Sequence, residues 1–93
     1  MQYVLIVHEV ESYPAWKVIF DRASSIRKAA GEISYQLLQQ DEEQNSIVHF
    51  SHWNSLKNAR SFFESRALQA IRREAGVKDP KFIYLNEIEH RTL

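Results

Sequence analysis

Histidine is the side chain best suited to acid–base chemistry near neutral pH, and this sequence has four. His8 lies in the apolar stretch Gln2–Val10, whereas His49 and His52 both lie in Ser46–Trp53. Near the end of a strand, a side chain on a helix-facing side lines the mouth of any pocket beneath the helices. We therefore predict His8 as a general base, with His49 as the alternate. The competing interpretation is a partly buried His8 that is hydrogen-bonded to a neighbour.

The spacing of His49 and His52 is that of an H-x-x-H motif, which on a helix would suggest a metal site. On a strand, residues three apart point to opposite faces, so the two cannot share an ion. The sequence has no cysteine, and no glutamate completes a zinc-protease motif. One of these histidines could still join His8 across a sheet, so a two-histidine site stays open. We predict no metal and no cofactor.

Aromatic residues make up 12% of the sequence, and most of them are expected to fill the core. The functional alternative is that some of them wall a flat ligand pocket. Asn86 is a short amide in an apolar segment, which needs partners if it is buried and none if it is exposed at a frayed strand end. The predicted substrate-binding residues are Trp16, Phe20, Tyr35, Trp53, Phe63, Tyr84 and Asn86.

Charge and glycine content exclude several classes of protein. Twelve Lys and Arg balance twelve Asp and Glu, which argues against nucleic-acid binding. The segment Ile47–Trp53 also lacks the basic-Gly-aromatic-Gly start of RNA-recognition strands. Two glycines cannot build a phosphate-binding loop, and no G-x-S-x-G elbow occurs. The basic residues around the second helix are expected to form a solvated face: Arg66, Arg72, Arg73, Lys78 and Lys81.

The elements that position these residues are read from hydrophobic period and from four punctuating residues, namely Pro14, Gly31, Gly76 and Pro80. The first apolar stretch is a predicted strand, and three- and four-residue spacing then predicts a helix from Ser12 to Gly31. A hairpin follows, with strands Ile33–Gln40 and Ser46–Trp53 joined through Asp41–Asn45. The second predicted helix begins after Asn54 or Ser55, breaks near Ser65 and ends at Gly76. The last predicted element is a strand, Lys81–Glu89.

This order predicts one α+β domain, residues 1–93, with the ferredoxin-like βαββαβ arrangement. Its four-stranded antiparallel sheet carries both helices on one face. The first and last strands are apolar on both faces, since Leu5, Val7, Ile83 and Leu85 alternate with a second apolar set. A sheet face exposed to water would alternate with polar residues instead. A second copy of the chain is the simplest cover, so we predict a homodimer through the sheet faces.

Cellular location is predicted from absences. The sequence has no cysteine to form disulfides, which favours a reducing compartment. The apolar run Tyr3–Val7 is too short for a signal-peptide core or a membrane span. We therefore expect a cytoplasmic protein without membrane partners.

Four segments of the sequence resemble the dimeric α+β barrel superfamily and, within it, the antibiotic-biosynthesis-monooxygenase-like domains. They are Val7–Val10, Tyr13–Trp16 with Phe20-Asp21, Ser51–Ser55, and Ala75–Val77. The resemblance implies two ferredoxin-like sheets facing each other as a barrel, with a ligand pocket in each subunit between helices and sheet. Some relatives perform cofactor-free oxygenation of aromatic polyketides, whereas others bind haem, isomerise, cyclise or have no known activity.

Two functions are therefore expected. The first is a cofactor-independent monooxygenase acting on a phenol- or quinol-like substrate, and the second is a non-catalytic dimeric module that holds a small apolar or aromatic ligand. Whether the protein is an enzyme is left open at this point.

Overall fold

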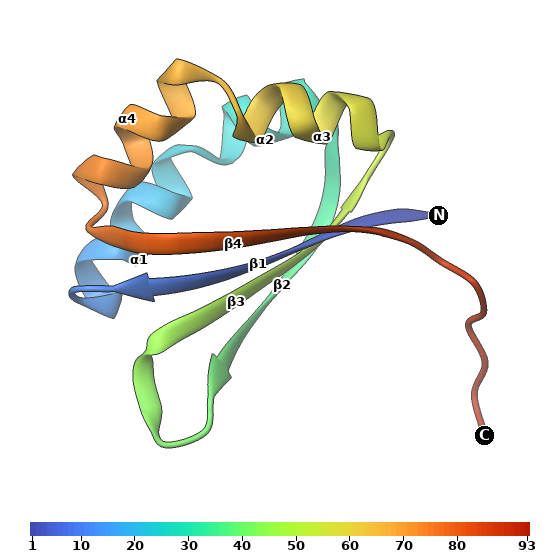
Figure 1. Cartoon of the computed structure of the whole chain (residues 1–93), viewed down its shortest axis with the longest axis horizontal. Helices are drawn as coiled ribbons and strands as arrows, with labels where there is room; N and C mark the ends of the chain where they lie inside the picture. The colour runs from blue at the N-terminus through green and yellow to red at the C-terminus, as the bar shows by residue number, and fades with distance from the viewer.

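The computed structural model describes residues 1–93 as one antiparallel sheet with all four helices on the same face (Figure 1). Along the chain the elements are β1 (Gln2–Val10), α1 (Tyr13–Arg22), α2 (Ser24–Ala30), β2 (Glu32–Gln40), β3 (Glu43–Trp53), α3 (Leu56–Phe63), α4 (Arg66–Glu74) and β4 (Val77–Asn86). The strand order is β2-β3-β1-β4. The predicted ferredoxin-like α+β fold is confirmed.

The first predicted helix is divided at Ala23, so the prediction of one continuous helix to Gly31 is wrong there. Its start is as expected, because the Ser12 hydroxyl caps α1 by accepting from the Ala15 N–H. At the division, the Arg27 guanidinium donates to the Phe20 carbonyl. That carbonyl also accepts from the Ala23 N–H three residues on, which is the tight turn typical of a helix end.

The second helical region breaks where the sequence predicts. Ser55 caps α3 by accepting from Asn58 N–H, and Ser65 caps α4 by accepting from Leu68 N–H. Gly76 follows α4 with a positive φ of 75°, a conformation that glycine adopts without steric cost.

Two strand boundaries differ from the prediction. The hairpin is tighter than expected, since only Asp41 and Glu42 form its turn and β3 already begins at Glu43. Strand β4 begins at Val77, includes Pro80 and ends at Asn86. Proline is tolerated there because β4 lies at the sheet edge.

The helix-facing side of the sheet carries the core in two clusters. The first consists of Val4, Ile6, Trp53, Ala59 and Phe63, and the second of Val10, Trp16, Phe20, Ile47 and Ala75. A cavity lies among the side chains of this layer, between helices and sheet.

The opposite side of the sheet has no helix against it (Figure 1). Its central row contains Phe50, Leu5 and Ile83, paired side by side across β3, β1 and β4. The face is therefore apolar, as the sequence predicts. No helix combines the length and the hydropathy that crossing a membrane requires.

Candidate functional site

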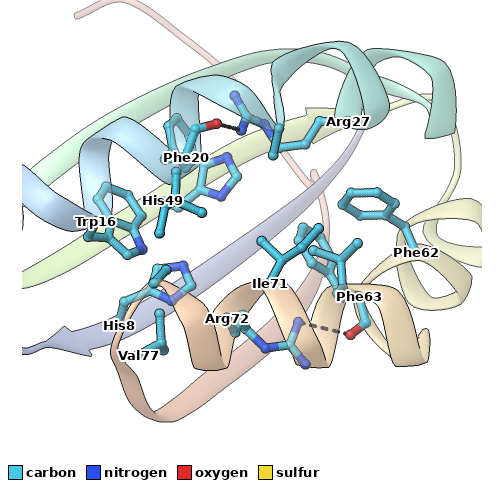
Figure 2. Close-up of a pocket in the computed structure, with 14 residues that line it drawn as sticks. His8, Trp16, Phe20, Arg27, His49, Phe62, Phe63, Ile71, Arg72 and Val77 are labelled. Atoms are coloured by element: carbon cyan, nitrogen blue, oxygen red, sulfur yellow. Dashed lines mark hydrogen bonds between the residues drawn. The ribbon is translucent and has the colours of Figure 1, made fainter.

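A cavity of about 50 Å³ lies between the helices and the sheet. Fourteen residues line it and ten of them are hydrophobic. The four polar residues are His8 from β1, Arg27 from α2, His49 from β3 and Arg72 from α4 (Figure 2). Such a volume holds a few water molecules or one small functional group.

His8 is buried in this layer without a hydrogen bond. Its side chain lies opposite Ile47 of β3, and on the β4 side the pairing shifts register between Val7 and Glu9. The ring lies 5.5 Å, centroid to centroid, from the ring of Trp16. The residue is 5% exposed, and its Nδ1 atom has no hydrogen-bond partner. Burial lowers the pKa of His8 to about 3, with smaller contributions from His49 and Arg72, so the imidazole is neutral at physiological pH.

His49 belongs to a buried network of three side chains, together with Glu32 and Arg27. Its Nε2 lies 2.8 Å from Oε2 of Glu32, and Oε1 of Glu32 accepts from Nε of Arg27 at 2.8 Å. The three side chains are at most 5% exposed. With its ring proton on Nε2, His49 donates to Glu32, and Nδ1 is then the nitrogen left without a proton.

The Phe20 ring packs against two members of this network, Arg27 and His49. The Arg27 guanidinium carbon lies 3.7 Å from the centroid of the Phe20 ring, and His49 meets the same ring edge-on at 5.0 Å. Aromatic rings favour both contacts electrostatically. The division between α1 and α2 therefore positions this network of side chains as well as the cavity wall.

Arg72 reaches the cavity from the opposite side. Its NH1 donates to the Phe63 carbonyl at 3.0 Å, and its guanidinium carbon lies 5.0 Å from the centroid of the Phe82 ring. Burial lowers the pKa of Arg72 from its ordinary value. The sequence-based interpretation of the basic cluster as a solvated face holds for Arg66, Arg73, Lys78 and Lys81, which are exposed, but not for the half-buried Arg72.

The structure brings together five of the residues that the sequence singles out, namely His8, His49, Trp16, Phe20 and Phe63, all of which line the cavity. The other four do not line it. Trp53 is buried in the core, where Nε1 donates to Oγ of Ser51 at 2.7 Å. Tyr35 is 46% exposed at the sheet edge, against the rings of Phe20 and His49.

Tyr84 and Asn86 lie toward the other end of the helix-facing side. The Arg60 guanidinium carbon lies 4.6 Å from the centroid of the Tyr84 ring. Asn86 is exposed, and its Oδ1 accepts from Nε2 of Gln2 at 3.0 Å. Asn86 therefore matches the interpretation of an exposed amide at the strand end.

Sequence reasoning missed several residues of the site, above all Arg27, Glu32 and Arg72. Arg27 follows Phe20 by seven residues and Arg72 follows Leu68 by four, so each lies on an apolar helical face. A charged residue within such a face is the signal that could have identified them. The apolar lining residues that were missed are Ile19, Ala23, Phe62, Leu68, Ile71, Ala75 and Val77.

The two histidines differ in what they can do chemically. His8 is held neutral in an apolar position, and a group with a pKa of about 3 is a weak base. His49 is backed by the Glu32 carboxylate, which orients the ring. The predicted base His8 therefore lies where its neutral form is favoured, and the alternate, His49, is the histidine with a carboxylate partner.

Comparison with known proteins places this geometry in a family. The sequence profile of the family described as antibiotic biosynthesis monooxygenase matches residues 15–74, which is more than half of the chain. No sequence among curated proteins matches this chain.

Solved structures share the fold at low sequence identity. SnoaB, a cofactor-independent oxygenase from Streptomyces nogalater, superposes with a TM-score of 0.77 at 13% identity, covering 96% of this chain and 94% of SnoaB. A Bordetella bronchiseptica protein named for the same family gives 0.77 at 14% identity, covering 95% and 97%. Rv0793 from Mycobacterium tuberculosis gives 0.68 at 15% identity, covering 99% and 100%. By sequence profile and by fold, this chain belongs to the antibiotic biosynthesis monooxygenase family.

Proposed function

We propose that the protein binds a small phenol- or quinol-like compound in the cavity beneath the helices and oxidises it with dioxygen, without a cofactor. The observation that carries this proposal is the His49–Glu32 pair and a neutral, unbonded His8 at one cavity, whose other lining residues are apolar apart from Arg27 and Arg72. SnoaB is described as a cofactor-independent oxygenase, which supports the same reaction class for a chain of this family.

In the proposed reaction the substrate supplies all the electrons. Nδ1 of His49 takes a proton from the substrate, and the resulting anion is electron-rich enough to reduce dioxygen. For a ring CH2 group activated by a phenol or ketone, the balanced reaction is CH2 plus O2 giving C=O plus H2O. Trp16, Phe20 and Phe63 supply apolar contacts that orient the ring.

A non-catalytic module that binds a small apolar metabolite is the second candidate, and the cavity favours it because side chains fill most of the space that an aromatic substrate would need. About 50 Å³ is well below the roughly 300 Å³ at which ligand pockets begin. A ring system enters only if side chains such as Ile71 and Phe62 move aside. In the close-up, Ile71 projects toward the middle of the site (Figure 2).

Oxygen uptake with anthrone or 1-naphthol, measured with an oxygen electrode, tests the oxygenase. We expect turnover above the uncatalysed rate, and His49→Asn should lower kcat/KM at least about 100-fold, the usual scale for loss of a positioned base. His90→Gln, in the exposed C-terminal tail, is the matched control and should leave kcat/KM unchanged. Ligand binding without oxygen uptake would support the binding module instead.

We further propose that two copies of the chain associate through the helix-free sheet face. Its half-buried apolar side chains include Leu5, Val7 and Phe50, and Ile83 is 47% exposed. Exposed apolar surfaces of this kind commonly mark protein interfaces. Each subunit would then keep its own cavity on the helix side.

A further inference from the structure

We propose that the cavity selects ligands that carry a carboxylate, with Arg72 as the counter-charge and His8 as a hydrogen-bond donor to the same group. This inference rests on the proposed binding function and adds the charge of the ligand. Neither His8 nor Arg72 is the base in the proposed oxygenation, so both have a separate role here.

The first observation is the imbalance of charge around the cavity. Two arginines line it, Arg27 and Arg72. Arg27 is neutralised by its ion pair with Glu32. Arg72 forms no ion pair with any carboxylate of the chain, so the cavity wall carries one uncompensated, half-buried positive charge. A charge in this position is stabilised by a counter-charge from outside the chain.

The second observation is independent of the first. The His8 residue is only 5% exposed, and its Nδ1 has no hydrogen-bond partner. A buried polar atom without a partner costs free energy that a ligand atom can recover. A neutral imidazole always offers one N–H donor, which a carboxylate oxygen accepts.

The donors match a carboxylate in number and in type. Only NH1 of Arg72 is used within the protein, by the Phe63 carbonyl, so the remaining guanidinium N–H groups are free to bind. A planar guanidinium fork pairs well with a planar carboxylate. His8 and Arg72 both line the cavity, from β1 and α4 (Figure 2). The cavity volume of about 50 Å³ suits a carboxylate head group, and a ring behind that group enters once Ile71 and Phe62 move aside.

Benzoate and benzamide provide a matched pair of probes, since they have similar shape and differ in charge. Binding is measured by calorimetry and located by the ring ¹⁵N shifts of His8. We expect benzoate to bind about ten- to hundredfold more tightly than benzamide, the scale of a charge-assisted hydrogen bond. Arg72→Met should abolish this preference, whereas Arg73→Met should preserve it, because Arg73 is the exposed neighbour on the same helix.

Arg72→Lys is a second variant in case Arg72→Met does not fold. It keeps the charge and loses the fork, so it should retain part of the preference. Equal binding of the two probes, equal preference in the Arg72 and Arg73 variants, or no binding of benzoate at millimolar concentration would each overturn the inference. The oxygenase is judged separately by oxygen uptake. A preference for benzoate together with no oxygen uptake on anthrone or 1-naphthol contradicts the oxygenase alone, and turnover of neutral phenols with no benzoate preference contradicts the carboxylate site alone.

Discussion

At the scale of single residues, the site is defined by how each charged group is compensated. Glu32 compensates two neighbours at once, Arg27 and His49, through oxygens that each lie 2.8 Å from a nitrogen. His8 needs no counter-charge, because its low pKa keeps the imidazole neutral. Arg72 is the one cation of the cavity wall that no carboxylate of the chain pairs with. These differences generate predictions that involve no ligand.

Glu32→Gln should destabilise the protein by about 3 kcal/mol, because it leaves Arg27 buried without its counter-charge. Asp21→Asn is the matched control, since it breaks the exposed pair of Asp21 with Lys17 and should cost less than about 1 kcal/mol. Urea unfolding at neutral pH measures both. Similar losses in the two variants would contradict the role of Glu32 described above.

The burial of His8 predicts a pH dependence of stability. The unfolded chain takes up this proton near the ordinary pKa of 6.5, whereas the folded protein does so only near pH 3. Between these values the unfolded state binds more protons, so stability falls as the pH is lowered through this window. The slope from this group is at most about 1.4 kcal/mol per pH unit.

His8→Asn should therefore remove part of the loss of stability between pH 7 and pH 4, measured as the free energy of unfolding in urea. His90→Asn, at an exposed tail position, should follow the wild-type curve. Parallel curves for the His8 variant and the wild type would show that His8 is not held neutral by the fold.

At the scale of elements, residues on both sides of each helix division line the cavity. The division at Ala23 lets Arg27 turn back onto Phe20, and the division at Ser65 sets α4 apart from α3. Strand β4 contributes a register shift opposite His8. In a continuous helix, these helical side chains would instead follow the regular spacing of three and four residues along one face.

Ser65→Ala should destabilise α4 by about 1 kcal/mol, because the Ser65 hydroxyl accepts from Leu68 N–H and donates to the Phe62 carbonyl. Hydrogen exchange of the α4 amides should accelerate accordingly. Ser61→Ala, at an exposed position within α3, should change stability by less than about 0.5 kcal/mol. If α4 exchange rates were the same in both variants, the cap would not be what orders α4.

At the scale of the whole molecule, the helices cover one face of the sheet and leave the other face without helices. The row Phe50, Leu5 and Ile83 crosses the centre of that face. Tyr3 stacks on Phe50 at 5.1 Å between ring centroids, which adds aromatic surface to the same face. Covering it would remove apolar area from water at roughly 25 cal/mol per Å².

Leu5→Lys should convert the proposed dimer into a folded monomer of 11.0 kDa, because it places a charge at the centre of the interface. Asn58→Lys, exposed on the helical layer, is the control and should leave the dimer intact. Sedimentation velocity distinguishes the two masses. A wild-type protein that sediments as a monomer at micromolar concentration would refute the proposed dimer.

The sequence by itself determined the order of elements, the faces of the strands and the family resemblance, because these depend on local periodicity and capping. Alternation placed Ile47, His49, Ser51 and Trp53 on one face of β3, as the structure has them. The break at Ser65 was likewise readable from a serine between two apolar helical stretches. The division at Ala23 was not, because it depends on a side chain seven residues from the carbonyl that it binds.

Only the tertiary structure decided which of the singled-out residues share a cavity. Trp53 and Tyr84 are aromatic like several lining residues, but their rows in the sheet put them outside the cavity. The pairing of Glu32 with His49 joins residues 17 positions apart, and local sequence carries no record of such a contact. Periodicity fixes the face on which a side chain lies, whereas packing between elements fixes its neighbours.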